Sequence, residues 1–160
     1  MNVDDTNVGG WKDTALRRIL NATTYNSLSI ENNIKRVKKD FIPTYNVNSI
    51  GETEDYLWLL SCGEIWNNGY SDESGRGLAI TKEGKQYKYY EINLKGTKYN
   101  EISEITQKPS VSKSDEWWLR SPYLKNSKNF CVVYGGKNSG GRCVSGIASR
   151  FCGVAPGFSI

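Results

Sequence analysis

The first quarter of the chain begins with the apolar spacing of an amphipathic helix. In residues 10–21, GWKDTALRRILN, the apolar side chains that fall on one helical face are Leu16, Ile19 and Leu20. Asp13 or Thr14 precedes them as an N-cap, and Arg17 and Arg18 fall outside the apolar face. The pattern predicts a helix that buries this face.

A second helix is predicted over residues 30–41, where apolar residues recur four, three and four positions apart. Ser29 supplies a cap and Pro43 supplies the stop. The basic side chains of this stretch fall mainly on its other faces: Lys35, Arg36, Lys38 and Lys39. We interpret them as a solvated face and not as a nucleic-acid-binding patch.

The period changes after residue 55. Residues 56–60 form a compact apolar run that is typical of a buried strand. The following SCGE has the Ser-x-x-Glu form of a capping box, which predicts a short helix from Cys62. Residues 67–77 are rich in Asn, Gly and Ser and predict a loop, in which Asp72 and Glu73 do not match a calcium-binding spacing.

From residue 86 onward, the sequence predicts strands. QYKYYEI, residues 86–92, alternates only in part. FCVVYGGKNSGGRCVSGI predicts two strands, residues 130–134 and 142–147, joined by a glycine-rich connection of seven residues whose tip protrudes. Its glycines lack the G-K-[ST] sequence and the following helix of a phosphate-binding loop.

These elements predict one α+β domain over residues 1–160, with residues 1–8 flexible. The chain begins without a basic and then apolar leader, and its longest apolar run is LWLL. We therefore expect a soluble protein without a signal peptide or membrane insertion.

The basic charge is local. Residues 117–160 hold six basic and no acidic side chains, whereas residues 1–116 hold 15 basic and 17 acidic ones. Two interpretations stay open: a patch that attracts an anionic partner by electrostatic steering, or an incidental run of basic residues in a mildly basic protein.

The chain contains no histidine, so neither a Ser-His-Asp triad nor a Cys-His pair can be assembled from it. The carboxylates left for acid–base work are Asp55, Glu64, Asp72, Glu73, Asp115 and Glu116, and none stands in a motif that raises its pKa. We therefore expect no enzymatic activity and no cofactor.

The four cysteines are Cys62, Cys131, Cys143 and Cys152, and no C-x-x-C pair occurs among them. This spacing disfavours a structural zinc site. Buried thiols are favoured over disulfides in a chain without a leader, although the even count leaves disulfides open.

Residues 123–150 combine Tyr and Arg with Ser, Asn, Gly and Lys, a composition shared by binding surfaces and ordinary loops. The candidate ligand-binding residues are Tyr123, Lys125, Asn126, Asn129, Tyr134, Asn138, Arg142, Ser145 and Arg150.

Four motifs, in order, resemble a family of bacterial and phage domains: GWKDTALRRILN, LWLLSCGEIW, WWLRSP and GVAPGFSI. They span residues 10–160. The family resembles a branch of the C-type-lectin-like fold, shared with the variable proteins of diversity-generating retroelements and with formylglycine-generating enzymes. Ala155 and Gly157 depart from the commoner form of the last motif.

The resemblance implies a C-type-lectin-like fold, with two N-terminal helices packed on short antiparallel strands and long loops. It implies a non-enzymatic protein, carried on a phage virion or bacterial surface, that binds a protein or glycan ligand on a cell surface through residues 123–150. In the variable proteins a retroelement rewrites the corresponding segment, and a homo-oligomer is compatible with the family. The alternatives are an assembly module of a particle and, less favoured, a copper oxidase using Cys143 and Cys152.

In such a fold WWLRSP is a frame strand that Pro122 ends, and Arg120 is fixed by carbonyls or a carboxylate near the display face. GVAPGFSI is the closing strand, with Val154 and Phe158 buried. The expected scaffold residues are Trp117, Trp118, Arg120, Pro122, Val154, Pro156 and Phe158.

Overall fold

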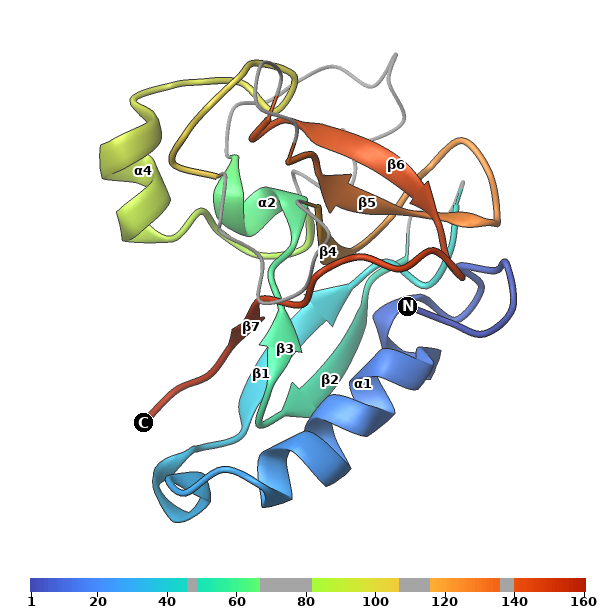
Figure 1. Ribbon diagram of the computed structural model, residues 1–160, viewed down its shortest axis with the longest axis vertical. Helices are drawn as coiled ribbons and strands as arrows, with labels where there is room; N and C mark the ends of the chain where they lie inside the picture. Colours follow the sequence, from blue (N-terminus) through green and yellow to red (C-terminus); the bar gives the residue numbers. More distant parts are fainter. Residues whose placement is uncertain (46–48, 67–81, 107–115, 136–139) are drawn as a thin grey trace.

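A computed structural model describes residues 1–45, 49–66, 82–106, 116–135 and 140–160. It is a small α+β domain with short antiparallel sheets and few helices (Figure 1). The coarse class expected from the sequence is therefore confirmed. None of the helices in these ranges is long and apolar enough to span a membrane.

The first predicted helix is confirmed, although it changes pitch along its length. A 3-10 turn, Gly10–Asp13, leads into α1, Ala15–Ile19, and the chain continues as a wider π-turn, Leu20–Thr24. Thr14 is the N-cap, and its hydroxyl oxygen accepts a hydrogen bond from the Arg17 amide at 3.1 Å. Leu20 is buried, but Ile19 is 53% exposed, so the predicted apolar face is only partly right.

The second predicted helix is wrong. Apart from a 3-10 turn, Glu31–Asn33, the region forms β1, Val37–Phe41, which pairs antiparallel with β2, Gly51–Asp55. Along β1 the inward positions alternate, and Lys39 occupies one of them. The apolar residues alone have helical spacing because the inward-facing Lys39 is not counted in an apolar pattern.

The middle of the chain follows the predicted order of strand and helix. β3, Trp58–Leu59, leads into α2, Cys62–Ile65. The predicted capping box is present: the Ser61 hydroxyl accepts from the Glu64 amide, and the Glu64 carboxylate accepts from the Ser61 amide. The partly alternating stretch after residue 86 instead contains a helix, α4, Lys88–Leu94, because Tyr90 and Leu94 lie one turn apart and are both buried.

The predicted hairpin is confirmed, and WWLRSP is its neighbour. β4, Trp117–Pro122, pairs with β5, Asn129–Val133, and β5 pairs with β6, Cys143–Ile147, all antiparallel. Every residue of β4 is buried. Successive side chains of the sheet enter two cores on opposite faces: Trp117, Leu119, Cys131 and Val133 on one, and Trp118, Phe130 and Val132 on the other.

The closing motif forms a short strand, β7, Pro156–Gly157, which pairs with β3. Gly157 lies against the Trp58 indole, where a Cβ would come within 2.9 Å of the ring nitrogen. Val154 is half-buried, but Phe158 is 47% exposed, so its predicted burial is wrong. The strand pairing ends before Phe158, and a Lys35 amide bond to the Ser159 carbonyl ties down the end of the chain.

Candidate ligand-binding surface

Arg120 is the buried centre of the frame. Its guanidinium donates to the carbonyls of Asp40, Leu59 and Glu83 at 2.7–3.0 Å. It also donates to the Glu64 carboxylate at 2.5 Å. The expected partners of Arg120, carbonyls and a carboxylate, are confirmed, but the side chain is fully buried and does not reach a display face. It joins β1, β3, α2 and β4 into one rigid unit.

Lys39 completes an ion network with Glu64. The Lys39 ammonium lies 2.7 Å from Glu64 and 2.6 Å from the Tyr87 hydroxyl, and it lies over the Trp58 ring at 4.4 Å. Burial works to raise the pKa of Glu64, but Arg120 and Lys39 outweigh it, so the pKa is lowered and the carboxylate stays charged. The interpretation of Lys39 as part of a solvated face is wrong, because its ion partner is 25 residues away in the sequence.

Glu83 is a fully buried carboxyl group, although no motif in the sequence marks it as a candidate. It accepts from the Ile42 amide at 2.8 Å and from the Ser121 hydroxyl. Burial raises the pKa of Glu83 to about 7, although Arg120 acts in the opposite direction. Because solvent does not reach it, its contacts are those of a structural group that joins the end of β1 to β4.

Three of the carboxylates considered for acid–base chemistry lie in the described residues, and each is engaged. Asp55 accepts from the Trp11 indole and from Arg17 at 2.7–2.8 Å. Glu64 lies in the network above, and Glu116 pairs with Arg150 at 2.9 Å. Asp72, Glu73 and Asp115 lie outside the described residues.

None of the four cysteines, all of which lie in the described residues, forms a disulfide, in agreement with the prediction of thiols. Cys62, Cys131 and Cys143 are buried together, with sulfurs within 4.8 Å of one another. Cys152 packs against the opposite core, beside Glu116. Cys143 and Cys152, the pair that the oxidase resemblance implied, therefore face different cores.

Three of the predicted contact residues meet in one hollow beside the open end of the β5–β6 pair. Asn129, Ser145 and Arg150 line a pocket of about 460 Å³. The rest of its wall is Asp5, Gly146, Ile147 and Ser149. Asn129, Ser145 and Arg150 are only partly buried or exposed, so their side chains are accessible from solvent. We call these seven residues the β6 hollow.

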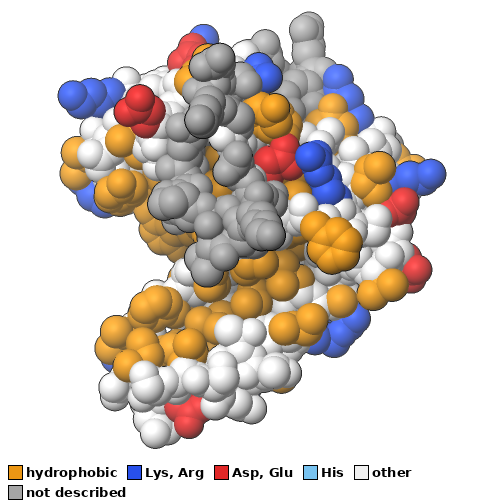
Figure 2. Space-filling view, viewed as in Figure 1, with side chains coloured by type: hydrophobic (Ala, Val, Ile, Leu, Met, Phe, Trp, Pro, Cys, Tyr) orange, Lys and Arg blue, Asp and Glu red, His pale blue; other side chains and the backbone are white. Residues whose placement is uncertain are grey.

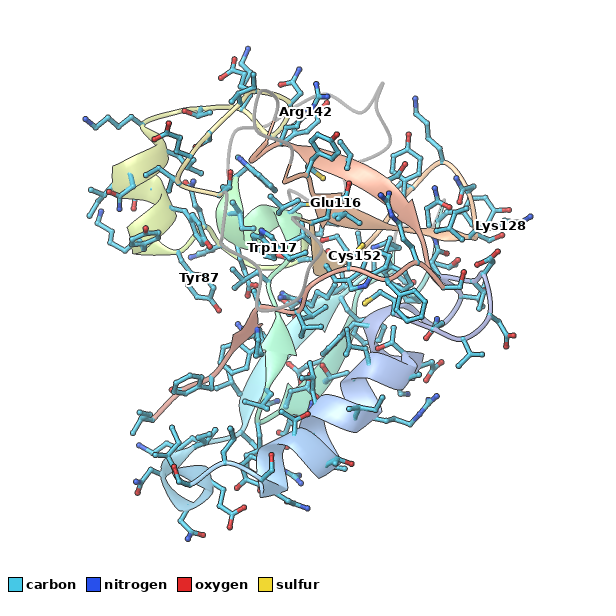
Figure 3. The ribbon with its side chains drawn as sticks, viewed as in Figure 1. Tyr87, Glu116, Trp117, Lys128, Arg142 and Cys152 are labelled. Carbon is cyan, nitrogen blue, oxygen red and sulfur yellow. The ribbon has the colours of Figure 1, made fainter. Side chains whose placement is uncertain are left out.

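The remaining predicted contacts lie elsewhere. Arg142 lies over the Tyr134 ring at 5.6 Å, and it is at the opposite end of the β5–β6 pair from Lys128 (Figure 3). Asn138 lies outside the described residues. Lys125 is exposed, and Tyr123 is half-buried at the end of β4.

Asn126, a predicted contact residue, stabilises the turn between β4 and β5. Its carboxamide oxygen accepts from the Lys128 and Asn129 amides and so closes the β4–β5 turn. Buried Asn7 clamps the same turn by donating to the Asn126 and Asn129 carbonyls at 2.7 and 2.8 Å. Residues 1–8 were expected to be flexible, but Asn7 and its neighbours are hydrogen-bonded to this turn and to α1.

One family model matches the chain. It covers residues 1–160 and describes a domain of unknown function, DUF6273. The chain belongs to the DUF6273 family. No curated protein and no solved structure matches it.

Two further hollows of this DUF6273 domain are more apolar and were not foreseen. One, of about 250 Å³, adjoins the β6 hollow at Arg150 and is bordered by Val3, Ile19 and Phe151. The other, of about 370 Å³, is lined by Lys39, Trp58, Tyr87 and Phe158 among others. Figure 2 shows hydrophobic side chains gathered where this face is hollowed between the upper and lower parts of the molecule. Tyr87 lies on the upper side of that hollow (Figure 3).

Proposed function

We propose that this domain is a non-enzymatic ligand-recognition domain with a C-type-lectin-like fold, which binds a protein or glycan on a cell surface through the β6 hollow. The observation that carries the proposal is the convergence of Asn129, Ser145 and Arg150 on one accessible pocket. These three residues come from β5, β6 and the segment after β6. The carrier is a phage virion or bacterial surface.

The frame favours recognition because it holds the hollow rigidly. β4 is buried throughout, and Arg120 binds it to β1, β3 and α2. A binding surface that is ordered before the ligand arrives loses less conformational entropy on binding. The side chains in the hollow combine hydrogen-bonding groups with the apolar Ile147 and charged Arg150, which suits a polar ligand with a small apolar face.

Not all of the basic excess of residues 117–160 contributes to the surface charge. Arg120 is buried and neutralised by Glu64, so it adds nothing to the surface potential. The described cations that remain on the surface of this part are Lys125, Lys128, Arg142 and Arg150. Arg150 forms an ion pair with Glu116, which partly neutralises its charge. The strongest cationic character is therefore at the ends of the β5–β6 pair.

The proposal is tested with variants of the hollow. The double variant Ser145→Ala/Arg150→Ala is expected to weaken binding to whole bacterial cells or an immobilised glycan panel at least tenfold, with little change in melting temperature. Tyr134→Ala/Arg142→Ala tests the other end of the strand pair. Lys88→Ala, in an exposed pair on α4, is the matched control. Binding by the parent that Ser145→Ala/Arg150→Ala leaves unchanged would refute the proposal, whether or not Tyr134→Ala/Arg142→Ala alters it.

A retroelement origin is tested separately by sequencing the surrounding genome. We expect a reverse transcriptase gene and a near-copy of the 3′ end of the coding region that differs mainly at adenines. The codons that differ should include those of Asn129, Ser145 or Arg150. Finding neither gene nor copy leaves a fixed binding domain.

An assembly module is the second candidate, and the exposed apolar border beside Arg150 favours it. Phe151 is 95% exposed, with Val3 and Ile19 near it around the same hollow. Exposed apolar groups gathered in one place are typical of protein–protein contacts. If this surface mediates self-assembly, Phe151→Ser converts the oligomer to a monomer in sedimentation velocity, whereas a parent that is monomeric at every concentration excludes it.

A further inference from the structure

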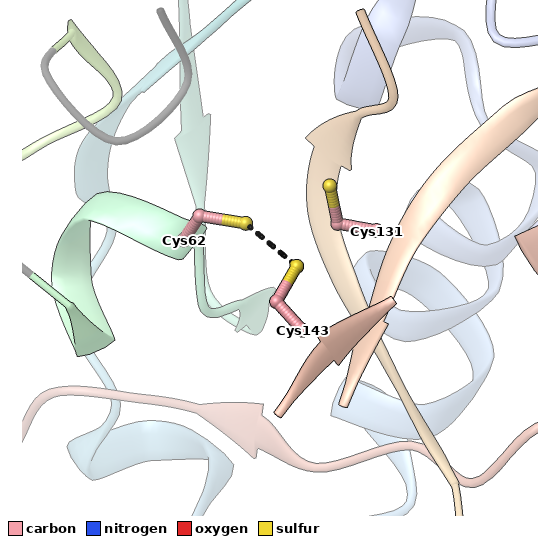
Figure 4. Close-up of side chains that lie close together, drawn as sticks. All are labelled: Cys62, Cys131 and Cys143. Atoms are coloured by element: carbon pink, nitrogen blue, oxygen red, sulfur yellow. Dashed lines mark hydrogen bonds between the residues drawn. The ribbon is translucent and has the colours of Figure 1, made fainter. Parts of the chain in front are cut away.

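Three cysteine sulfurs converge in the interior of the domain, apart from the β6 hollow (Figure 4). Cys62 and Cys143 have their sulfurs 3.6 Å apart, and all three sulfurs, including that of Cys131, lie within 4.8 Å of one another. The residues come from α2, β5 and β6, so the convergence is a product of the fold and not of a local sequence motif. The side chains are buried within one core.

The backbone holds each thiol in place. Cys62 begins the capped helix α2, and its amide donates to the Ser121 hydroxyl at 2.9 Å. Cys131 and Cys143 lie on neighbouring strands and face the same side of the sheet, with Cys143 paired with Val133 and Cys131 with Ser145. The Cys143 amide also donates to the Tyr99 carbonyl at 2.7 Å. The cluster is therefore anchored by the frame itself.

The sulfur spacing fits a shared ion. A metal ion bound to three thiolates at about 2.3 Å in one plane requires sulfur–sulfur distances of roughly 4 Å. The Cys62–Cys143 sulfur distance of 3.6 Å and the upper limit of 4.8 Å for all three pairs are close to that value. Small rotations of the side chains would bring all three sulfurs into contact with one ion.

We propose that Cys62, Cys131 and Cys143 form a three-coordinate thiolate site for a soft metal ion of the Cu(I) type. Soft thiolate donors select such ions. A structural zinc site takes four ligands, and the described residues place only these three candidate donors together. The chain has no histidine to supply a fourth.

Binding exchanges protons for the metal. Each ligating thiol releases one proton to solvent, with no change in the oxidation state of sulfur or metal. Burial raises the pKa of the Cys62 thiol well above its usual range, and hydrogen bonds with the neighbouring thiols, together with burial, do the same for Cys131. Metal affinity is consequently expected to rise steeply with pH.

The test is a titration of the reduced full chain with Cu(I), under anaerobic conditions, against the chromophoric competitor bicinchoninate. We expect one equivalent bound per chain, a thiolate-to-copper charge-transfer band in the ultraviolet, and three sulfur neighbours by X-ray absorption. The same protein should compete poorly for Zn(II). Stoichiometry below one, or equally tight Zn(II) binding with four ligands, overturns the proposal.

Variants separate the cluster from the remaining thiol. Cys131→Ala and Cys143→Ala should each lower Cu(I) affinity at least tenfold, whereas Cys152→Ala, the matched control on the opposite core, should leave it unchanged. Near-ultraviolet circular dichroism of the tryptophans verifies that each variant is folded. Cu(I) binding that survives in folded Cys131→Ala and Cys143→Ala refutes the site. A Cys62–Cys143 disulfide that persists after treatment with reductant also refutes the site. Mass spectrometry of the purified chain would detect it as a loss of two hydrogens.

Discussion

Glu83→Gln is expected to change how the stability of the domain depends on pH. The buried carboxyl of Glu83 accepts from the Ile42 amide and the Ser121 hydroxyl, and burial raises its pKa from 4.5 to about 7. A carboxyl that holds its proton more tightly in the folded state stabilises that state below pH 4.5. This contribution is lost as the pH rises through 7.

The size of the effect follows from the shift. Raising a pKa from 4.5 to about 7 corresponds to roughly 3 kcal/mol over the whole titration, most of which, roughly 2–3 kcal/mol, falls between pH 5 and pH 8. Glutamine keeps an acceptor for the Ile42 amide and stays neutral, so the variant lacks this loss. The free energy of unfolding of Glu83→Gln, relative to the parent, should therefore increase by roughly 2–3 kcal/mol from pH 5 to pH 8.

The assay is urea unfolding followed by tryptophan fluorescence, with parent and variant measured side by side at each pH. Taking the difference between the two proteins cancels the other titrating groups, including Glu64, whose lowered pKa acts at more acidic pH. Glu91→Gln, on the exposed side of α4, is the matched control for removing one carboxylate. A difference between parent and Glu83→Gln that is the same at pH 5 and pH 8 would refute the reasoning.

Further predictions concern the frame and can be checked by the same unfolding assay. Arg120→Met should cost about 3–5 kcal/mol, because it leaves the Glu64 carboxylate buried beside a single cation, and a cost below 1 kcal/mol would contradict the network. Ser61→Ala should cost about 1 kcal/mol by removing the cap of α2, whereas Ser27→Ala, at an exposed turn, is its control. Gly146→Ala should cost about 1–3 kcal/mol, since its Cβ would lie 2.8 Å from Val132, and an unchanged stability would show that the strand can shift.

The sequence predicted best where local chemistry and apolar pattern agreed. The Thr14 cap, the Ser61 capping box and the β5–β6 hairpin are all confirmed because each depends on residues close together in the chain. The prediction failed at β1, where Lys39 is buried by Glu64 and Tyr87 from other elements. It failed at Phe158 because pairing of β7 with β3 ends one residue earlier.

The sequence likewise indicated some residues of the candidate sites and not others. The composition of residues 123–150 pointed to Asn129, Ser145 and Arg150, which the fold brings together. Nothing local connects Asp5 with that segment, because only the docking of the first residues onto the β4–β5 turn brings it there. The thiol cluster was likewise hidden, since Cys62 lies 81 residues before Cys143 and no knuckle spacing marks the set.

One face of the β5–β6 pair carries both proposed sites, and the register of the two strands decides which residue belongs to which. Near α2, this face directs Cys131 and Cys143 into the core. Farther from α2, the same face directs Ser145 and Ile147 into the hollow. Gly146 lies between these two positions, and a Cβ on it would come within 2.8 Å of the Val132 side chain and 3.3 Å of the Trp118 ring. A slip of one residue would turn Ser145 toward Trp118 and Cys143 away from Cys62. The contact of Gly146 with the WWLRSP strand therefore fixes the hollow and the thiol cluster together.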